Sequence, residues 1–244
     1  MKKINIKQKL ENIGISLDSI VMGDFDYIGR FTAERHRSQD DPNYKKYGAF
    51  YRSNYERGIL IYHLIRKYEI TSMLEIGFGR GYSTFCAAKA FHDAGVKGNI
   101  TTVDPALDEK YLNMLQQVFP KDWFDYIQFV KGTSSQMLPQ ISGKFDFVYI
   151  DGDHSYEGTK SDWEMTKEKW NKCLLFDDYH LPTKNDPGIQ CRDLIDSIQD
   201  DSKELIIMDR RMFFDDRRFT DEQIDYGQVL LTKPELQSND WLSQ

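Results

Sequence analysis

The sequence lacks several features that would assign it to a class at once. No apolar run approaches the roughly 18 residues of a membrane span. Residues 1–7 are polar-interrupted and lack the apolar core of a secretory signal. Only three cysteines occur among 244 residues, and none forms a Cys-x-x-Cys pair. We therefore expect a cytoplasmic protein without membrane contact, in which Cys86, Cys173 and Cys191 are reduced and buried.

Positive charge is also scarce. The formal net charge is −7, which disfavours broad nucleic-acid binding. The balance is uneven, because residues 1–60 carry a net +3 and the remainder carries −10. A basic amino-terminal cap over an acidic cleft would give this distribution, and so would a solvated surface segment. The sequence leaves the oligomeric state open, with a homo-oligomer among the options.

The patterning indicates a globular α/β protein. Hydrophobic residues make up 40% and charged residues 29%, as in soluble domains. Short apolar segments alternate with helical patterns, which predicts parallel strands connected by helices. The predicted strands lie near residues 71–76, 98–104, 126–130, 145–150, 172–176, 205–208 and 228–231. We expect a Rossmann-like, doubly wound, seven-stranded and mostly parallel sheet with helices on both faces and an antiparallel last strand.

The amino-terminal part fits this pattern less well. Residues 1–20 contain a weakly amphipathic helical stretch, and residues 21–50 show no period but many aromatic and charged side chains. We predict that residues 1–50 form an extension or lid and that residues 51–244 form the main domain. A capping box at Ser53 and Glu56 predicts the start of that domain's first helix.

The most informative stretch follows the first of these predicted strands. Glu75 precedes three alternating glycines, Gly77, Gly79 and Gly81, which allow positive φ and a close backbone approach to a ligand. The spacing is not the Gly-x-Gly-x-x-Gly of nicotinamide-binding folds, and Glu75 would repel a pyrophosphate. It suits a ligand with positive charge near the turn, such as S-adenosylmethionine. A glycine-rich turn without a ligand is the alternative.

Carboxylates end four of the predicted strands, where ligands bind in open parallel sheets. Asp104 follows Gly81 by 23 residues, the place where an acid reaches ribose hydroxyls, although it could merely cap the next helix. Asp151, Asp177 and Asp178 would repel one another by about 4 kcal/mol per pair at 4 Å and an effective dielectric of about 20. A cation such as Mg²⁺ would resolve this repulsion, and so would salt bridges.

A histidine accompanies these acids. His154 stands three residues after Asp151 in Ile150-Asp-Gly-Asp-His-Ser155 and could act as a general base. A structural role is the alternative. His180 is a weaker candidate for a base or ligand, and Asp153 fits a turn or cap.

Together these residues resemble the class I S-adenosylmethionine-dependent methyltransferases over roughly residues 50–180. More narrowly, they are similar to the metal-dependent O-methyltransferases related to catechol O-methyltransferase and to the macrolide-sugar O-methyltransferases. The segment Ile-Asp-Gly-Asp-His-Ser-Tyr-Glu at residues 150–157 is most similar to the sugar-modifying branch. One departure is Asp178, since some relatives carry an amide at this position. Residues 1–50 and 210–226 match nothing in that family, so the resemblance implies no choice of acceptor.

The resemblance implies a role for each matched position. Glu75, the three glycines, Tyr82 and Ser83 would hold the methionine part of S-adenosylmethionine, Asp104 the ribose and Ser134 the adenine side. Asp151, Asp177 and Asp178 would bind a divalent cation, with Asp151 counted among the cofactor-binding residues as well. His154 would be the catalytic base.

These implications define an expected enzyme. We expect an S-adenosylmethionine-dependent, Mg²⁺-dependent O-methyltransferase that acts on a hydroxyl of a small molecule, a sugar first and a phenol second. Aromatic residues between Tyr44 and Tyr55 could stack on either ring type. The alternatives are a metal-independent N- or C-methyltransferase and a non-catalytic module that binds S-adenosylmethionine.

Overall fold

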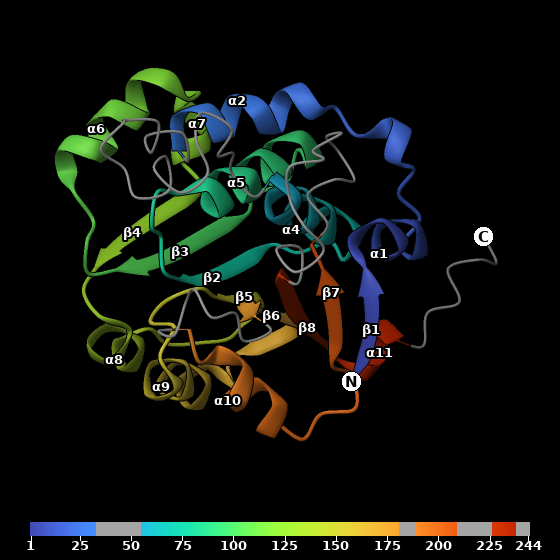
Figure 1. Cartoon of the computed structure of the whole chain (residues 1–244). Coiled ribbons are helices and arrows are strands. Elements are labelled where there is room, and N and C mark those ends of the chain that lie inside the picture. Colours follow the sequence, from blue (N-terminus) through green and yellow to red (C-terminus); the bar gives the residue numbers. More distant parts are fainter. Residues whose placement is uncertain (33–54, 181–188, 209–225, 238–244) are drawn as a thin grey trace, which may run out of the picture.

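The fold was analysed in a computed structural model, which describes residues 1–32, 55–180, 189–208 and 226–237. Within these residues, eight strands form one sheet between two layers of helices (Figure 1). The strands are β1 (Lys2–Asn5), β2 (Ser72–Ile76), β3 (Asn99–Asp104), β4 (Ile127–Lys131), β5 (Phe145–Ile150), β6 (Trp170–His180), β7 (Glu204–Ile207) and β8 (Tyr226–Thr232).

The order of the sheet is β1-β7-β8-β6-β5-β2-β3-β4. Strand β8 pairs antiparallel with β6 and β7, and the other neighbouring strands pair parallel. The predicted fold class is confirmed, including the antiparallel last strand. The strand count differs by one, because β1 adds an eighth strand beside β7 where the sequence predicted only a helix.

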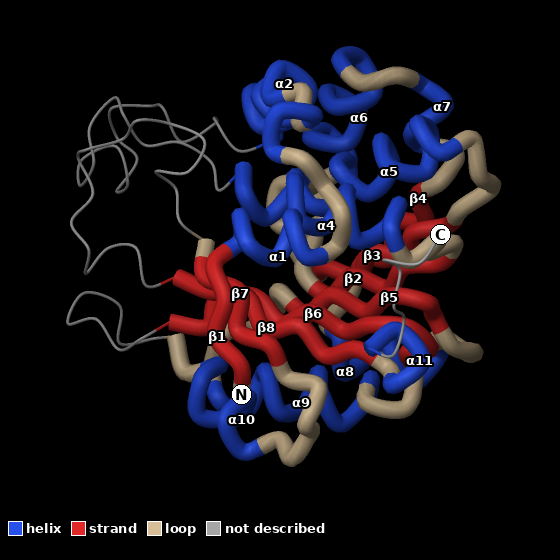
Figure 2. The backbone as a smooth tube through the Cα atoms, turned by 90° about the vertical axis from the view of Figure 1, so that its right-hand side faces the viewer, coloured by secondary structure: helices blue, strands red, loops and turns tan. Residues whose placement is uncertain are grey.

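Helices cover both faces of the sheet (Figures 1 and 2). One layer contains α1 (Ile6–Asn12), α2 (Met22–Thr32), α4 (Tyr55–Lys67), α5 (Tyr82–Ala94), α6 (Glu109–Val118) and α7 (Lys121–Phe124). The other contains α8 (Ser134–Met137), α9 (Tyr156–Thr166) and α10 (Cys191–Ser197). Short helical turns lie at Leu17–Ser19 and Leu138–Gln140, and α11 (Pro234–Gln237) follows β8.

The two layers create two apolar cores. Successive side chains of a strand point to opposite faces, so Phe147 and Tyr149 of β5 pack in one core and Val148 and Ile150 in the other. Central parallel strands are buried on both faces, which explains the near-continuous apolar run of β5. Both cores hold the carboxyl ends of the strands in a fixed arrangement.

The amino-terminal residues join this architecture. Residues 1–32 supply β1, α1 and α2, whose buried side chains belong to the first core. The helix α2 was not predicted; Gly29 allows it to pack close to the ring of Tyr55, where a Cβ atom would lie 2.1 Å from Cε1. The predicted boundary at residue 50 stays a prediction, because residues 33–54 lie outside the described residues.

Several other predictions concern parts of the chain that the structure does not describe. They involve Ser53 of the capping box, the aromatic residues 44–54, the stretch 210–225 and the side chain of His180. Among the residues that are described, no helix is both long and apolar enough to cross a membrane.

Candidate active site

The glycine turn after β2 forms one end of the candidate site. Gly77, Gly79 and Gly81 have φ values of +93°, +52° and +84°, which side-chain-bearing residues rarely adopt. At Gly77 a side chain is also excluded by space, since a Cβ atom would lie 1.9 Å from the carbonyl oxygen of Asp151. Gly81 is the N-cap of α5. The turn therefore lies against the end of β5 and ends where α5 begins.

Glu75 lies completely buried beneath this turn. Its carboxylate accepts hydrogen bonds from the hydroxyls of Ser83 at 2.5 Å, Thr102 at 2.6 Å and Thr84. Burial raises the pKa of Glu75 to about 7, although the three hydroxyls oppose the shift. In this structure Glu75 links β2, β3 and α5, and its predicted contact with a ligand stays a prediction.

Asp104 connects the glycine turn to the end of β3. One carboxylate oxygen accepts a hydrogen bond from the backbone N–H of Gly79 at 2.8 Å, and the other accepts one from Ala106 at 2.6 Å. Asp104 thus closes its own local turn and also borders the space beside the glycines. Both interpretations of this residue are compatible with the geometry.

A cleft of about 810 Å³ opens at this edge of the sheet. Of the predicted site residues, Gly77, Gly79, Asp104, Ser134, Asp151 and His154 line it. Sites for small molecules have volumes of roughly 300–1,000 Å³, so the cleft suits a ligand of nucleoside size. Gly81, Ser83 and Tyr82 lie behind the lining, where the hydroxyl of Tyr82 donates to the backbone carbonyl of Tyr55 at 3.1 Å.

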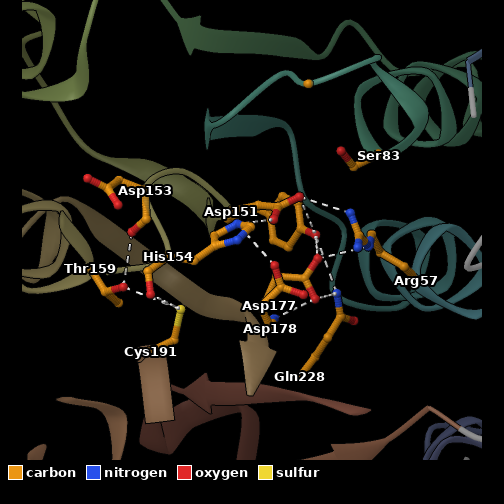
Figure 3. A network of polar contacts seen from close by, with 12 residues as sticks. Arg57, Ser83, Asp151, Asp153, His154, Thr159, Asp177, Asp178, Cys191 and Gln228 are labelled. Atoms are coloured by element: carbon orange, nitrogen blue, oxygen red, sulfur yellow. Dashed lines mark hydrogen bonds and ion pairs between the residues drawn. The ribbon is translucent and has the colours of Figure 1, made fainter. Parts of the chain in front are cut away.

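The side chains of Asp151, Asp177 and Asp178 converge (Figure 3), and Asp151 among them lines the cleft. Asp151 follows β5, while Asp177 and Asp178 are neighbours in β6. Neighbouring strand residues normally point to opposite faces. Here Asp178 has a φ of +51°, and the pairing of β6 with β8 shifts register between Phe176 and Tyr179. This bulge re-aims Asp178 toward the cleft edge.

His154 lies between two of the acids. Its Nε2 atom is 3.0 Å from Oδ2 of Asp178 and 3.4 Å from Oδ1 of Asp151. Hydrogen bonds to Asp151 and Asp178 raise the pKa of His154 to about 11, although burial opposes this shift. Ligand atoms of these three residues all lie within 4.8 Å of one another, close enough to hold one metal ion.

Arg57 is a site residue that the sequence analysis missed. It lies in the first turn of α4, with NH1 2.9 Å from Oδ2 of Asp151 and Nε 2.8 Å from Oδ2 of Asp177. Burial alone would lower the pKa of Arg57, but these carboxylates raise it well above its ordinary value. Topology was the available signal, since a helix that precedes a parallel strand begins near the carboxyl edge of the sheet.

The carboxylate of Asp177 contacts several side chains of the protein. Besides Arg57, the hydroxyl of Tyr149 donates to it at 2.5 Å and Nε2 of Gln228 at 3.2 Å. Burial raises the pKa of Asp177 to about 7 despite the opposing charge of Arg57. The structure thus brings Asp151, Asp178 and His154 together, and it places Asp177 beside Arg57. The role of Asp177 as a metal ligand stays a prediction.

Asp153 does not belong to this cluster. Its carboxylate accepts a hydrogen bond from the backbone N–H of Ser155 at 2.9 Å, and the side chain of Ser155 caps α9. The prediction of a turn residue is confirmed here. The turn that contains Asp153 brings His154 back to the cleft, where it lies beside Asp151.

Comparisons with known proteins agree with this geometry. Residues 74–179 match the family described as "Methyltransferase domain". A segment of 89 residues is 36% identical to the O-methyltransferase hkm8 of Aspergillus hancockii and covers 35% of this chain. The matched segment covers 33% of the length of this relative, so the chain spans about a third of it.

Solved structures share the fold. The O-methyltransferase TomG of Streptomyces achromogenes, involved in tomaymycin synthesis and solved with S-adenosylmethionine, aligns with a TM-score of 0.58 and 15% identity. That alignment covers 93% of this chain and 96% of TomG. An O-methyltransferase of Bacillus cereus, solved with S-adenosylhomocysteine, aligns with a TM-score of 0.55 and 18% identity over 93% and 97% of the chains.

Proposed function

We propose that this protein, whose residues 74–179 match a methyltransferase domain, transfers the methyl group of S-adenosylmethionine to a hydroxyl group of a small molecule. The resemblance found in the sequence is borne out at the level of this domain. The observation that carries the proposal is the continuity of the cleft. The same cleft is lined by the glycine turn and Asp104 and by Asp151 and His154.

The chain's own residues would divide the work along this cleft. The turn at Gly77 and Gly79 and the start of α5 would receive the methionine part of the cofactor, as would Glu75, Gly81, Tyr82 and Ser83 around it. Asp104 would accept hydrogen bonds from the ribose hydroxyls, and Ser134 would border the adenine. Positioning of donor and acceptor is the main catalytic contribution that such a rigid edge offers.

His154 would move the proton. Its Nε2 atom points to the carboxylates at the inner end of the cleft. To act as a base, the imidazole must be neutral, whereas the hydrogen bonds to Asp151 and Asp178 raise its pKa to about 11. The charge or the position of Asp151 and Asp178 must therefore change before His154 can accept the proton of an acceptor hydroxyl.

The same residues fit a divalent cation. The carboxylates of Asp151 and Asp178, whose oxygens lie within 4.8 Å of each other, are suitable donors for Mg²⁺ or Mn²⁺, which would take water or acceptor oxygens as further ligands. A bound cation would neutralise the acids, lower the pKa of a hydroxyl in contact with it and leave His154 neutral. Asp151, Asp177 and Asp178 remain the candidate ligands, with the acceptor a sugar or a phenol.

A transfer assay with chelator tests this function. The full-length protein is incubated with methyl-labelled S-adenosylmethionine and a panel of sugars and phenols, with EDTA or with added Mg²⁺ or Mn²⁺. We expect labelled product from at least one hydroxyl acceptor, loss of product with EDTA and recovery with metal. Product that is insensitive to EDTA would favour a metal-independent enzyme. Bound cofactor that is never converted would favour a binding module.

A further inference from the structure

A second pocket, of about 290 Å³, lies among the helices on the α4 side of the sheet. It is lined by residues of α2, α4 and α5 and of the segment before α2, and these helices share one layer in Figure 1. It has no lining residue in common with the candidate active site. We infer that this pocket binds a small carboxylate with an apolar, aromatic body, and that Arg66 and His63 hold the carboxylate group.

The pocket is separated from the cleft along the length of α4. Arg57, in the first turn of this helix, contacts Asp151 at the edge of the sheet. The pocket residues of α4 follow between Tyr62 and Arg66. Because an α-helix rises 1.5 Å per residue, Arg66 lies about 14 Å further along the axis than Arg57. A ligand in the pocket would therefore not compete with a cofactor in the cleft.

The walls of the pocket are largely apolar. Ile15, Ile20 and Val21 come from the segment before α2, while Phe25 of α2 lies opposite Tyr62 of α4. The rings of Phe25 and Tyr62 meet edge to face, with their centroids 5.6 Å apart. Val21 keeps 63% of its surface exposed, the largest value among the large apolar side chains of the described residues. A ligand with an aromatic ring would bury this apolar surface and contact the two rings.

Arg66 supplies a positive charge that no acid balances directly. Its NH1 atom donates to the hydroxyl of Tyr62 at 2.8 Å, and it forms no ion pair with a carboxylate of the described residues. Asp24 and Asp93 instead contact Lys89, at 3.1 Å and 2.7 Å. A guanidinium has five N–H donors, so most of those of Arg66 remain for a ligand. A carboxylate is the group that binds such donors in pairs.

His63 supplies a polar group without a partner. Only 9% of its surface is exposed, and its Nε2 atom is buried without a hydrogen bond to any described residue. Burial lowers the pKa of His63 to about 4, and the charge of Arg66 lowers it as well, so the imidazole is neutral at pH 7. A neutral imidazole has one N–H donor. A buried polar group without a partner destabilises the fold, and a carboxylate that accepts from this imidazole would remove that cost.

Binding of phenylacetate to the full-length protein tests the site. Titrations at pH 7, followed by NMR signals of the ligand, compare phenylacetate with phenylacetamide, which lacks the charge, and with acetate, which lacks the ring. We expect phenylacetate to bind at least about fivefold more tightly than either of the other two. Saturating S-adenosylhomocysteine, which would occupy the cleft, should not displace it.

Variants of the two polar residues locate the bound probe. Arg66→Gln should weaken the binding of phenylacetate about fivefold or more and leave that of phenylacetamide unchanged, because only the charged hydrogen bonds are lost. The side chain of Arg66 is exposed, so the fold should tolerate this change. Arg30→Gln is the matched control, since Arg30 is also exposed, pairs with Asp26 at 3.1 Å and does not line the pocket.

His63→Leu separates a ligand-binding role from a structural one. It removes the unpartnered polar group at similar volume, so the thermal midpoint should rise by about 2–4 °C. The binding of phenylacetate should nevertheless weaken about threefold or more, because a donor to the carboxylate is lost. A residue that serves only the fold would not combine these two effects.

Several results would overturn the inference. They are the absence of phenylacetate binding up to about 10 mM, equal affinities for phenylacetate and phenylacetamide, and displacement by S-adenosylhomocysteine. Unchanged phenylacetate binding by Arg66→Gln would overturn it as well, and so would a His63→Leu protein with a lower midpoint and unchanged binding. None of these results affects the proposed methyl transfer, which the assay with labelled S-adenosylmethionine tests separately.

Discussion

The two ends of the cleft hold their carboxylates in different ways. At the glycine end, Glu75 is surrounded by hydroxyls and Asp104 by backbone N–H groups, all of them neutral donors. At the acidic end, Arg57 and His154 supply positive charge to the three aspartates. The neutral donors are part of the scaffold, whereas the side chains of both cations, Arg57 and His154, are partly exposed. We therefore propose that the first end binds the cofactor and that proton transfer takes place at the second.

The largest effect expected from this comparison is on His154. His154→Ala removes the proposed base at the acidic end, so turnover should fall at least about a hundredfold. Cofactor affinity should stay within about threefold, because the glycine end is unchanged. Turnover is followed with labelled S-adenosylmethionine and affinity by calorimetry with S-adenosylhomocysteine.

His92→Ala is the control for this variant. The imidazole of His92 is half-exposed and lies 3.0 Å from Asp122, away from the cleft. Its loss should leave turnover and cofactor affinity unchanged. A His154→Ala protein that keeps its turnover would show that the proton leaves by another route.

Asp104→Asn tests the glycine end. A carboxylate that accepts from ribose hydroxyls contributes about 1.5–3 kcal/mol per charged hydrogen bond, so cofactor affinity should weaken about 10–100-fold. Turnover at saturating cofactor should change little, since the acidic end is intact. Calorimetry and initial rates provide the two measurements.

Asp108→Asn is the matched change for Asp104. Asp108 also accepts a hydrogen bond from a backbone N–H, that of Lys110 at 2.9 Å, but it does not line the cleft. Equal losses of affinity in both variants would mean that Asp104 acts only by holding its turn.

The sequence was sufficient for most of the glycine end. Alternating apolar segments predict a parallel sheet, and parallel strands place their carboxyl ends at one edge. Gly77 and Asp104 were therefore placed in one cleft from their positions in the chain, whereas Ser134 was placed there only by the resemblance. The strand β1 was missed because it has only four residues and its sequence follows the pattern of a helix. Its pairing with β7, a tertiary contact, determines that it forms a strand.

The acidic end was predictable only in part. Its three aspartates follow from the strand ends, but their directions depend on the positive φ of Asp178, which no sequence pattern indicates. Arg57 was missed because a charged residue in the first turn of a helix is most often solvated. Its partners are 94 and 120 positions away in the chain.

Glu75 should make the glycine end sensitive to pH. Burial raises the pKa of Glu75 from its ordinary value of 4.5 to about 7 in the folded protein. The folded state thus holds an extra proton between these values. The contribution of this protonation to the free energy of unfolding is complete below pH 4.5. It is lost as the pH rises through 7, by about 3 kcal/mol in total. Denaturant unfolding of Glu75→Gln between pH 5 and 8 should show a shallower fall in free energy than the unchanged protein.

The smallest effect is expected for Thr102→Val, which removes one donor to Glu75 at nearly constant shape. A hydrogen bond to a charged group contributes about 1.5–3 kcal/mol, so the variant should lose about that much at pH 8. At pH 5 the carboxyl is protonated and needs fewer donors, so the loss should be smaller. Because the hydroxyl of Thr102 lowers the pKa of Glu75, its removal should also steepen the fall with pH. An equal loss at both pH values, measured by denaturant unfolding, would mean that Thr102 acts through packing and that the neutral donors do not stabilise the charge.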